Sequence, residues 1–317
     1  MAKVIVAGAG QWGRNLVRTF HELGALAGVA EADPGIRSRL EEEYPGLALY
    51  KDYRDALDTD VPAIIVATPA ATHAQIAREA LMAGKDLFIE KPMTLSVSDA
   101  EELVLLAEAR QRILMVGHLL LYQPAIQKIK ELIEQGTIGE LRGLHQERLK
   151  LGRVRSIENV LWSFGVHDLA VMLYLTGQFP INVHAAGHCI LQPEIEDDVY
   201  VHLKFAGGVT AHLHTSWLWP NQRRCLHVIG STGMLTYDEN EQTVILHRKT
   251  VDRLLMNVDL GEEVVFHGEA KPLTMECMHF LDCIESRRVP LSDGQNGLDV
   301  IRILETVSSK LRAGVVG

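Results

Sequence analysis

The sequence predicts an α/β protein with an N-terminal doubly wound parallel (Rossmann) sheet and a C-terminal α+β domain that contains a largely antiparallel open sheet. Short apolar strands alternate with helical patterns up to about residue 118, and a glycine-rich turn follows the first of these strands. After about residue 120 the rhythm changes, and strand-like segments follow one another without helices between them. Because 317 residues exceed what one hydrophobic core usually supports, we expect two domains, residues 1–118 and residues 119–317.

The first half is predicted to supply the parallel sheet. Its strand candidates are Val4–Ala7, Leu26–Ala30, Ala63–Ala67, Leu87–Ile89 and Ile113–Val116. The run Ile64-Ile65-Val66 is apolar on both faces, as parallel strands covered by helices on each side must be. An apolar stripe predicts a helix over Arg14–Leu23, and a capping box of Ser98 and Glu101 predicts the start of another.

The second half is predicted to form an antiparallel sheet with helices packed on one face. Helices are expected from Pro124 to near Gly136, and over Val166–Leu175, Thr274–Ile284 and Leu298–Leu311. Strands are expected over Asn182–Ile190, Val199–Phe205, Val209–Trp217 and Arg224–Ile229. Gly207-Gly208 lies between two of these strands and predicts a hairpin turn.

The overall composition excludes several classes of protein. The formal net charge is −10 and no block is dense in lysine and arginine, which argues against nucleic acid or an anionic membrane as partner. No run of about 18 apolar residues predicts a membrane span. The four cysteines lack CxxC spacing and read as reduced thiols, so we expect no metal site. The N-terminal residues lack the pattern of a secretory signal, so we expect a cytoplasmic protein.

A glycine loop, Gly8-x-Gly10-x-x-Gly13, follows the first strand and precedes an amphipathic helix, and the second strand leads into Glu31. This context predicts a dinucleotide site in which Gly10 lets the backbone approach a pyrophosphate and Glu31 accepts hydrogen bonds from the adenosine ribose. Its carboxylate would repel a 2′-phosphate, so NAD is favoured over NADP, although Arg37 and Arg39 moderate this preference. The alternative is a helix-capping turn that binds no ligand.

Two other predicted strands end in polar residues. Thr68-Pro69 and Glu90-Lys91-Pro92 follow these strands, and the carboxyl ends of parallel strands line one crevice. An ammonium at that position lowers the energy of an alkoxide that develops at a carbon giving up hydride. The alternative is a solvated lysine paired with Glu90.

These motifs together resemble the glucose–fructose oxidoreductase/inositol dehydrogenase (Gfo/Idh/MocA) family of NAD(P)-dependent oxidoreductases. The likeness rests on GAGQWG, ATPAATHAQIAREALMAGKDLFIEKP, VGHLLLYQP and HFLDCIESRRVPLSDGQNGLDVIRILE, and it covers essentially the whole chain. The resemblance implies that residues 1–118 bind the dinucleotide, that residues 119–317 bind substrate and mediate oligomerisation, and that Lys91 contacts the hydroxyl being oxidised. The candidate cofactor-binding residues are Gly8, Gly10, Gln11, Trp12, Gly13, Glu31, Thr68, Pro69, His73, Glu90 and Lys91.

His167 is the candidate for proton transfer, because it matches the Gly-x-His motif of that family and imidazole suits general acid–base work near neutral pH. The alternative is a helix-end histidine without a catalytic role. The chain departs from the family pattern at Ser163, where many relatives have aspartate, and at Leu121, where many have arginine. Asp168 cannot simply replace the missing carboxylate, because adjacent residues on a helix point about 100° apart.

The segment before His167 supplies a clue to the substrate. Arg148 and Lys150 alternate on one predicted strand face, and two arginines in the following loop can hold a carboxylate or phosphate. The alternative is a solvated, charged edge strand. The segment also resembles branches that act on nucleotide-linked sugars, such as UDP-N-acetylglucosaminuronate 3-dehydrogenases. The candidate substrate-binding residues are Tyr122, Arg153, Arg155, Trp162 and Asp168.

The leading hypothesis is an NAD-dependent dehydrogenase that oxidises a secondary hydroxyl of a sugar or nucleotide sugar. One alternative is a catalytically silent NAD(P)-sensing regulatory protein, and another is a glycoside-cleaving enzyme that uses transient oxidation by bound NAD. We expect a small-molecule substrate, no nucleic-acid or membrane partner, and a homo-oligomer, dimer or tetramer, formed through the C-terminal sheet.

Overall fold

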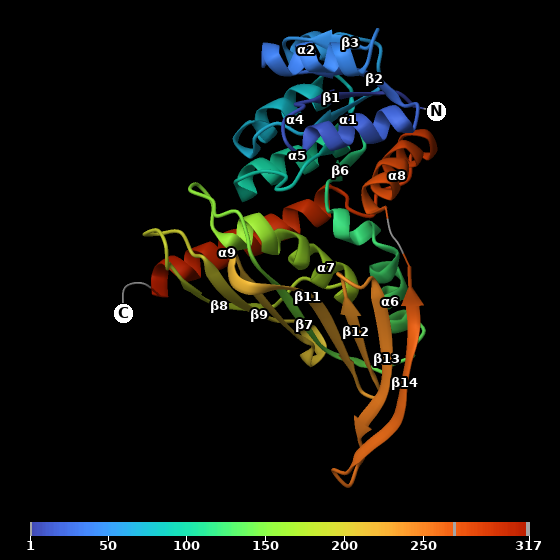
Figure 1. Cartoon of the computed structure of the whole chain (residues 1–317), viewed down its shortest axis with the longest axis vertical. Helices are drawn as coiled ribbons and strands as arrows, with labels where there is room; N and C mark the ends of the chain where they lie inside the picture. Colours follow the sequence, from blue (N-terminus) through green and yellow to red (C-terminus); the bar gives the residue numbers. More distant parts are fainter. Residues whose placement is uncertain (1, 269–270, 315–317) are drawn as a thin grey trace. The chain divides into compact units, whose positions relative to one another are not determined.

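The computed structural model describes residues 2–268 and 271–314, which fold into two compact units (Figure 1). The first unit comprises Met1–Leu119 and Lys271–Ile301, and the second comprises Leu120–Ala270 and Arg302–Gly317. The segment Lys271–Ile301 therefore packs with the N-terminal half, whereas the predicted boundary placed it in the second domain. Among the described residues, no helix is long and apolar enough to cross a membrane.

The first unit contains the predicted parallel sheet, which has six strands within the described residues, in the order β3-β2-β1-β4-β5-β6. The strands are β1 (Val4–Ala7), β2 (Leu26–Ala30), β3 (Ala48–Tyr50), β4 (Ala63–Val66), β5 (Asp86–Ile89) and β6 (Leu114–Val116). All residues of β1, β4, β5 and β6 are buried, as their continuous apolar runs predicted. The chain winds outward in both directions from the β1–β4 pair, which places the topological switch point, and hence a ligand crevice, at the carboxyl ends of these two strands.

Helices complete the first unit. They are α1 (Gly13–Glu22), α2 (Pro34–Glu43), α3 (Tyr53–Leu57), η1 (Ala70–Thr72), α4 (His73–Met82), α5 (Val97–Ala109) and α8 (Pro272–Ser286). Helix α5 begins earlier than predicted, because the extended residue Ser96 caps it and its Oγ accepts a hydrogen bond from the backbone N–H of Asp99 at 3.1 Å. The predicted capping box of Ser98 and Glu101 is therefore wrong by two residues.

Several contacts hold the segment Lys271–Ile301 against β5 and β6, as three examples show. The Arg287 guanidinium donates to the buried carboxylate of Asp86 at 2.6 Å, at the start of β5. The Ser292 hydroxyl donates to the carbonyl oxygen of Val116 at 2.6 Å, at the end of β6. Phe280 on α8 packs edge-to-face on Phe88, with ring centroids 5.7 Å apart.

The second unit is built on a sheet that has eight strands within the described residues, in the order β14-β13-β12-β11-β7-β10-β9-β8. The strands are β7 (Leu141–Leu151), β8 (Asn182–His188), β9 (Asp198–Lys204), β10 (Thr210–Ser216), β11 (Leu218–Gly230), β12 (Met234–Asp238), β13 (Thr243–Val251) and β14 (Asn257–His267). The β7–β10 pair is parallel and the other assigned pairs are antiparallel, so the largely antiparallel prediction is confirmed. Gly207 and Gly208 have the positive φ angles of the predicted turn, +74° and +87°.

Helical segments of the second unit lie on one face of its sheet (Figure 1). They are η2 (Leu119–Tyr122), α6 (Pro124–Glu134), a π turn η3 (Leu161–Gly165), α7 (Val166–Thr176) and the C-terminal part of α9 (Gly294–Gly314), whereas η4 (Ala206–Gly208) is the turn between β9 and β10. Helix α6 packs against β13 and β14, and α7 packs against β7. Side chains that alternate with the buried ones therefore point to the other, exposed face.

Candidate active site

The glycine loop connects β1 to α1 at the predicted switch point. Gly8 has a φ angle of +92°, and a Cβ there would lie 2.8 Å from the carbonyl oxygen of Ala67 on the neighbouring chain segment. A Cβ on Gly13 would lie 2.0 Å from the carbonyl oxygen of Gly8, so only glycine lets α1 start this close to the loop. A Cβ on the exposed Gly10 would meet open space. This combination of a tight loop with an open middle position fits a bound pyrophosphate.

Glu31 lies directly after β2 and faces the glycine loop. Its carboxylate accepts hydrogen bonds from the backbone N–H of Ala9 at 2.7 Å and from that of Asp33 at 2.9 Å. The Arg37 guanidinium lies nearby, where it donates to the backbone carbonyl oxygens of Glu31 at 2.6 Å and of Ala32 at 2.7 Å. An acidic side chain thus stands at the position where the ribose of a dinucleotide is read in this type of loop.

The ends of β4 and β5 are held together by His73, the first residue of α4. Its Nε2 lies 2.9 Å from the carbonyl oxygen of Thr68, and its Nδ1 lies 2.9 Å from that of Pro92. The side chain is buried, and burial lowers its pKa although both carbonyls favour the charged form. Both ring nitrogens face backbone oxygens, so His73 links the two strand ends, and its role in binding the cofactor stays a prediction.

Glu90 connects the glycine loop to the end of β5. Its buried carboxylate accepts a hydrogen bond from the indole N–H of Trp12 at 2.5 Å, and a second from the backbone N–H of Lys91 at 3.2 Å. Burial raises the pKa of Glu90 to about 7, although Trp12 and Lys91 oppose the shift. Glu90 therefore holds Trp12 of the glycine loop and the backbone of Lys91 through one shared carboxylate.

A second acid that the sequence reasoning missed lies near Glu90. Glu276 on α8 is buried, and neither of its carboxylate oxygens has a hydrogen-bond partner among the described residues. Burial, and then the charge of Glu90, raises the pKa of Glu276 well above the usual value of a carboxyl group. Its contact with Glu90 bridges 186 positions of the chain (276 minus 90), which no local pattern reveals.

Lys91 follows β5 and is half-buried, and its peptide bond to Pro92 is cis. The neighbouring His118 follows β6 and is buried, with its Nδ1 2.6 Å from the side-chain oxygen of Asn296. Burial lowers the pKa of His118 to about 4, and the cation of Lys91 lowers it further while Asn296 opposes the shift. A neutral imidazole thus lies beside the lysine. The motif VGH, at the carboxyl end of a predicted strand, was the signal that could have identified His118.

In the second unit, His167 is the second residue of α7, and its neighbour Asp168 is completely buried. Asp168 accepts a hydrogen bond from Arg148 Nε at 2.7 Å, and Arg148 also donates to Glu239 at 2.9 Å. Arg224 donates to the other oxygen of Glu239 at 2.7 Å. Two arginines and two carboxylates therefore form a closed network under α7. Asp168 is buried within this network, and its predicted role in binding substrate stays a prediction.

The structure revises part of the prediction for the segment that precedes His167. Strand β7 lies in the middle of the sheet order, so the alternative of a solvated edge strand is wrong. The ammonium of Lys150 lies 5.1 Å from the ring centroid of Phe164, and the indole N–H of Trp162 donates to the hydroxyl of Ser308 at 3.0 Å. Trp162 is thus anchored by its polar edge.

The remaining candidates differ in exposure. Arg153 is exposed and Arg155 is half-buried, with Nε 3.7 Å from a carboxylate oxygen of Glu158. Tyr122 is buried, whereas Gln11 is exposed in the glycine loop. The roles of these four residues stay predictions. Among the described residues, no group of three or more histidine, cysteine or acidic side chains could hold a metal ion.

The parallel sheet, the glycine loop after its first strand and the acid after its second strand define a dinucleotide-binding Rossmann unit. Residues 2–118 match the oxidoreductase family with an NAD-binding Rossmann fold, and residues 126–236 match the GFO/IDH/MocA C-terminal domain. The chain belongs to the Gfo/Idh/MocA family of oxidoreductases.

Individual relatives resemble the chain over most of its length. The UDP-N-acetylglucosamine 3-dehydrogenase of Acidithiobacillus ferrooxidans is 28% identical over 93% of this chain and 93% of its own. A structure of that enzyme has a TM-score of 0.87 and covers 98% of both chains at 27% identity. The myo-inositol 2-dehydrogenase of Thermotoga maritima is 27% identical over 68% of this chain and 69% of its own.

The geometry of the loop predicts opposite effects for two glycine substitutions. Gly10→Ala should leave the melting temperature unchanged, because its Cβ meets open space, and should weaken NADH binding by about tenfold, or 1.4 kcal/mol. Gly13→Ala should destabilise the protein by about 1–3 kcal/mol, because its Cβ meets the backbone of Gly8. Thermal melts and NADH fluorescence titration measure both effects. A Gly10→Ala protein that binds NADH normally would contradict the assignment of the loop.

Proposed function

We propose that this protein is an NAD-dependent dehydrogenase that acts on a secondary hydroxyl of a nucleotide sugar. NAD, when bound, accepts the hydride from the carbon that carries this hydroxyl. Lys91 orients the hydroxyl oxygen and stabilises the negative charge that develops on it. His167 takes up the hydroxyl proton, and returns it when the reaction runs toward reduction.

The observation that supports this proposal most directly is the bridge made by Glu90. One carboxylate receives the indole N–H of Trp12 in the glycine loop and the backbone N–H of Lys91, so the lysine is fixed beside the loop that fits a dinucleotide. The nucleotide-sugar assignment draws on the likeness to the UDP-N-acetylglucosamine 3-dehydrogenase, which extends over 93% of both chains. A solvated lysine with no role would not require this arrangement.

A substrate test separates the candidate functions. Purified protein is incubated with NAD and, in separate reactions, with UDP-N-acetylglucosamine, free N-acetylglucosamine and myo-inositol, and NADH absorbance is followed. We expect NADH to form with the UDP-sugar and not with the free sugar. Oxidation of myo-inositol alone would contradict the nucleotide-sugar assignment and leave the dehydrogenase assignment intact. Substrate consumption without net NADH would indicate transient oxidation, and no turnover of any compound would favour a regulatory protein.

Glu31 predicts the choice of cofactor. We expect NADH to bind more tightly than NADPH, because the carboxylate would repel a 2′-phosphate. Glu31→Gln keeps an oxygen to accept from the backbone N–H of Ala9 and removes the charge, so it should narrow the gap without loosening the loop. Fluorescence titration of the original protein and the variant with both reduced cofactors tests this. Equal affinities, or tighter NADPH binding, in the original protein would refute the preference.

We also propose that the protein self-associates through the exposed face of its eight-stranded sheet, and that it works in the cytoplasm. Large apolar side chains stand on that face: Tyr200, Ile229 and Met234 are 47%, 40% and 37% exposed. Such side chains are common in the contacts between identical subunits. The four cysteines are unpaired thiols, which fits a reducing compartment.

A further inference from the structure

Histidines are concentrated on the exposed face of the eight-stranded sheet. Of the 14 histidines in the chain, nine belong to the strands of this sheet. They are on its exposed face, because each one either alternates along its strand with buried residues or stands opposite a residue of that face on the neighbouring strand. They are His145, His184, His188, His202, His212, His214, His227, His247 and His267. Neither the dinucleotide site nor the proposed chemistry uses any of them. So many histidines on one face of the sheet suggest that this exposed face has a function of its own.

Five of these histidines form one continuous row, which we call the histidine row. It consists of His184, His202, His212, His145 and His227, which stand opposite one another on the adjacent strands β8, β9, β10, β7 and β11. Successive ring centroids are 6.2, 4.6, 6.2 and 6.2 Å apart. Every imidazole therefore lies within direct electrostatic reach of the next one.

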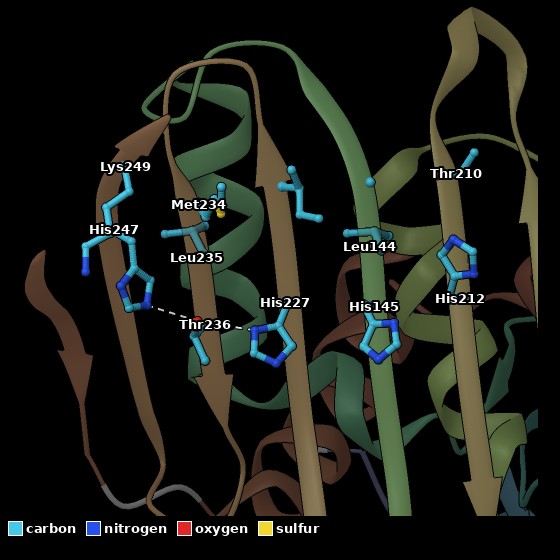
Figure 2. Close-up of a pocket in the computed structure, with 12 residues that line it drawn as sticks. Leu144, His145, Thr210, His212, His227, Met234, Leu235, Thr236, His247 and Lys249 are labelled. Carbon is cyan, nitrogen blue, oxygen red and sulfur yellow. Dashed lines mark hydrogen bonds between the residues drawn. The ribbon is translucent and has the colours of Figure 1, made fainter. Parts of the chain in front are cut away.

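The row continues through Thr236 on β12 to His247 on β13 (Figure 2). The Thr236 hydroxyl lies 3.4 Å from His227 Nδ1 and 3.0 Å from His247 Nε2. His247 Nδ1 ends the series 3.0 Å from a carboxylate oxygen of Glu262 on β14. Figure 2 shows His227, His145 and His212 side by side on adjacent strands. These three histidines are among the residues that line a pocket of about 550 Å³.

The charged groups near the row are largely neutralised within the chain. Glu147 on β7 pairs with Arg223 on β11 at 2.7 Å, and Glu262 also pairs with Lys249 on β13 at 3.3 Å. Asp198 on β9 pairs with His214 on β10 at 3.1 Å. Glu147 also lies 4.0 Å from Nε2 of His145, and Lys249 also lies 3.7 Å from Asp259 on β14. The other titratable groups on this face are Lys204 and Tyr200 of β9, His188 of β8, Cys225 of β11, Asp238 of β12 and His267 of β14. The histidines are thus the groups whose charge changes between mildly acidic and neutral pH.

Burial and neighbouring imidazoles oppose the protonation of two histidines of the row. The pKa of His212 is lowered by burial and then by His202 and His145, and that of His227 is lowered by burial and then by His145. A neutral imidazole offers one N–H donor and one acceptor nitrogen, so an unprotonated row presents both kinds of group along its length. A two-fold axis brings identical patches together, so a surface with both donors and acceptors can match itself, whereas a row of like charges cannot.

We propose that the histidine row is the contact through which two copies of this chain pair face to face, and that protonation of the row separates them. This inference rests on the proposed self-association. Pairing buries the imidazoles further and favours their neutral form, so the separated chains bind more protons than the pair does. The pair is therefore stable above the histidine pKa of about 6.5 and weakens as the pH falls below it.

The test measures the dissociation constant of the full chain by sedimentation at about pH 7.5 and about pH 5.5, on either side of the usual histidine pKa. A chelator is present so that metal ions do not bridge the histidines. An imidazole with a pKa of about 6.5 that must lose its proton contributes up to about tenfold between these two pH values, so two such imidazoles would raise the dissociation constant about 100-fold at the lower pH, which is the effect we expect. Equal association at both values would overturn the histidine row as the switch. No association at either value would overturn the self-association itself, while the dehydrogenase assay would stand.

Variants separate the row from a general effect of acid. The double variant His145→Gln, His212→Gln keeps hydrogen-bonding side chains that do not titrate, and should be measurably less sensitive to acid than the original protein while still pairing at about pH 7.5. His145→Arg imposes a permanent charge in the middle of the row and should separate the copies at about pH 7.5. His21→Gln, in α1 of the first unit, is the matched control and should behave like the original protein. An Arg variant that stays paired, or a double variant as acid-sensitive as the original, would overturn the proposal.

Discussion

Replacing Lys91 by methionine should lower kcat by about 100- to 1,000-fold, the usual effect of removing one donor to a developing oxyanion, and should leave the melting temperature nearly unchanged. Methionine keeps the unbranched stem and removes the ammonium. Lys91 is half-buried at the carboxyl end of β5, so the loss of its charge leaves no gap in the core. Steady-state oxidation rates and thermal melts of the same preparation measure the two quantities.

Lys85 provides a matched control at the opposite end of the same strand. It stands just before β5, is 8% exposed, and its ammonium donates to the carbonyl oxygens of Thr59 and, at 2.9 Å, of Val61. Lys85→Met removes the ammonium that donates to these two carbonyl oxygens. We expect it to destabilise the protein by about 1.5–3 kcal/mol and to leave kcat unchanged. If Lys91→Met instead unfolds the protein, or retains activity, then Lys91 is a structural residue and the catalytic assignment fails.

The parallel half of the fold was predictable because its strands are buried on both faces and carry continuous apolar runs. The predicted Val4–Ala7 and Leu26–Ala30 coincide with β1 and β2. Helices α2 and α3 were missed, because α2 buries only Leu40 and α3 has five residues, so neither presents an apolar stripe. Strand β14 was missed because its central residues are charged and exposed, and its pairing with β13 is what keeps it extended.

The residues of the candidate site differ in the same way: some belong to short sequence motifs, and others depend on partners far apart in the chain. The glycine loop, Glu31 and the end of β5 were identified because each is a short motif at a strand end. Glu276, Asn296 and the Arg148 network were not, because their partners lie in segments far apart in the chain and are specified only by packing. Asp168 illustrates this difference. A carboxylate beside a candidate catalytic residue was taken to face a ligand, yet it neutralises a buried arginine.

The network under α7 explains how His167 can be held without a carboxylate at position 163. Asp168, Arg148, Glu239 and Arg224 balance one another, and Asp168 ties the first turn of α7 to the central strand β7. Removing one member would leave a buried charge uncompensated, at a cost of about 3–5 kcal/mol. The backbone of His167, the residue next to Asp168, is thereby fixed. The ion pair between Asp168 and Arg148 thus links the start of α7 to the sheet.

His167→Asn should lower kcat by about 100- to 10,000-fold, the range for loss of a general base, while the melting temperature holds because the Asp168–Arg148 pair stays intact. Cofactor affinity should barely change, because His167 lies outside the unit that carries the glycine loop. The control is His267→Asn, an exposed histidine on β14, which should keep full activity. Rate, NADH affinity and melting temperature are measured on each protein. Near-normal turnover by His167→Asn would show that another group, such as Lys91, carries the proton, whereas a parallel loss of stability would show that His167 supports the fold.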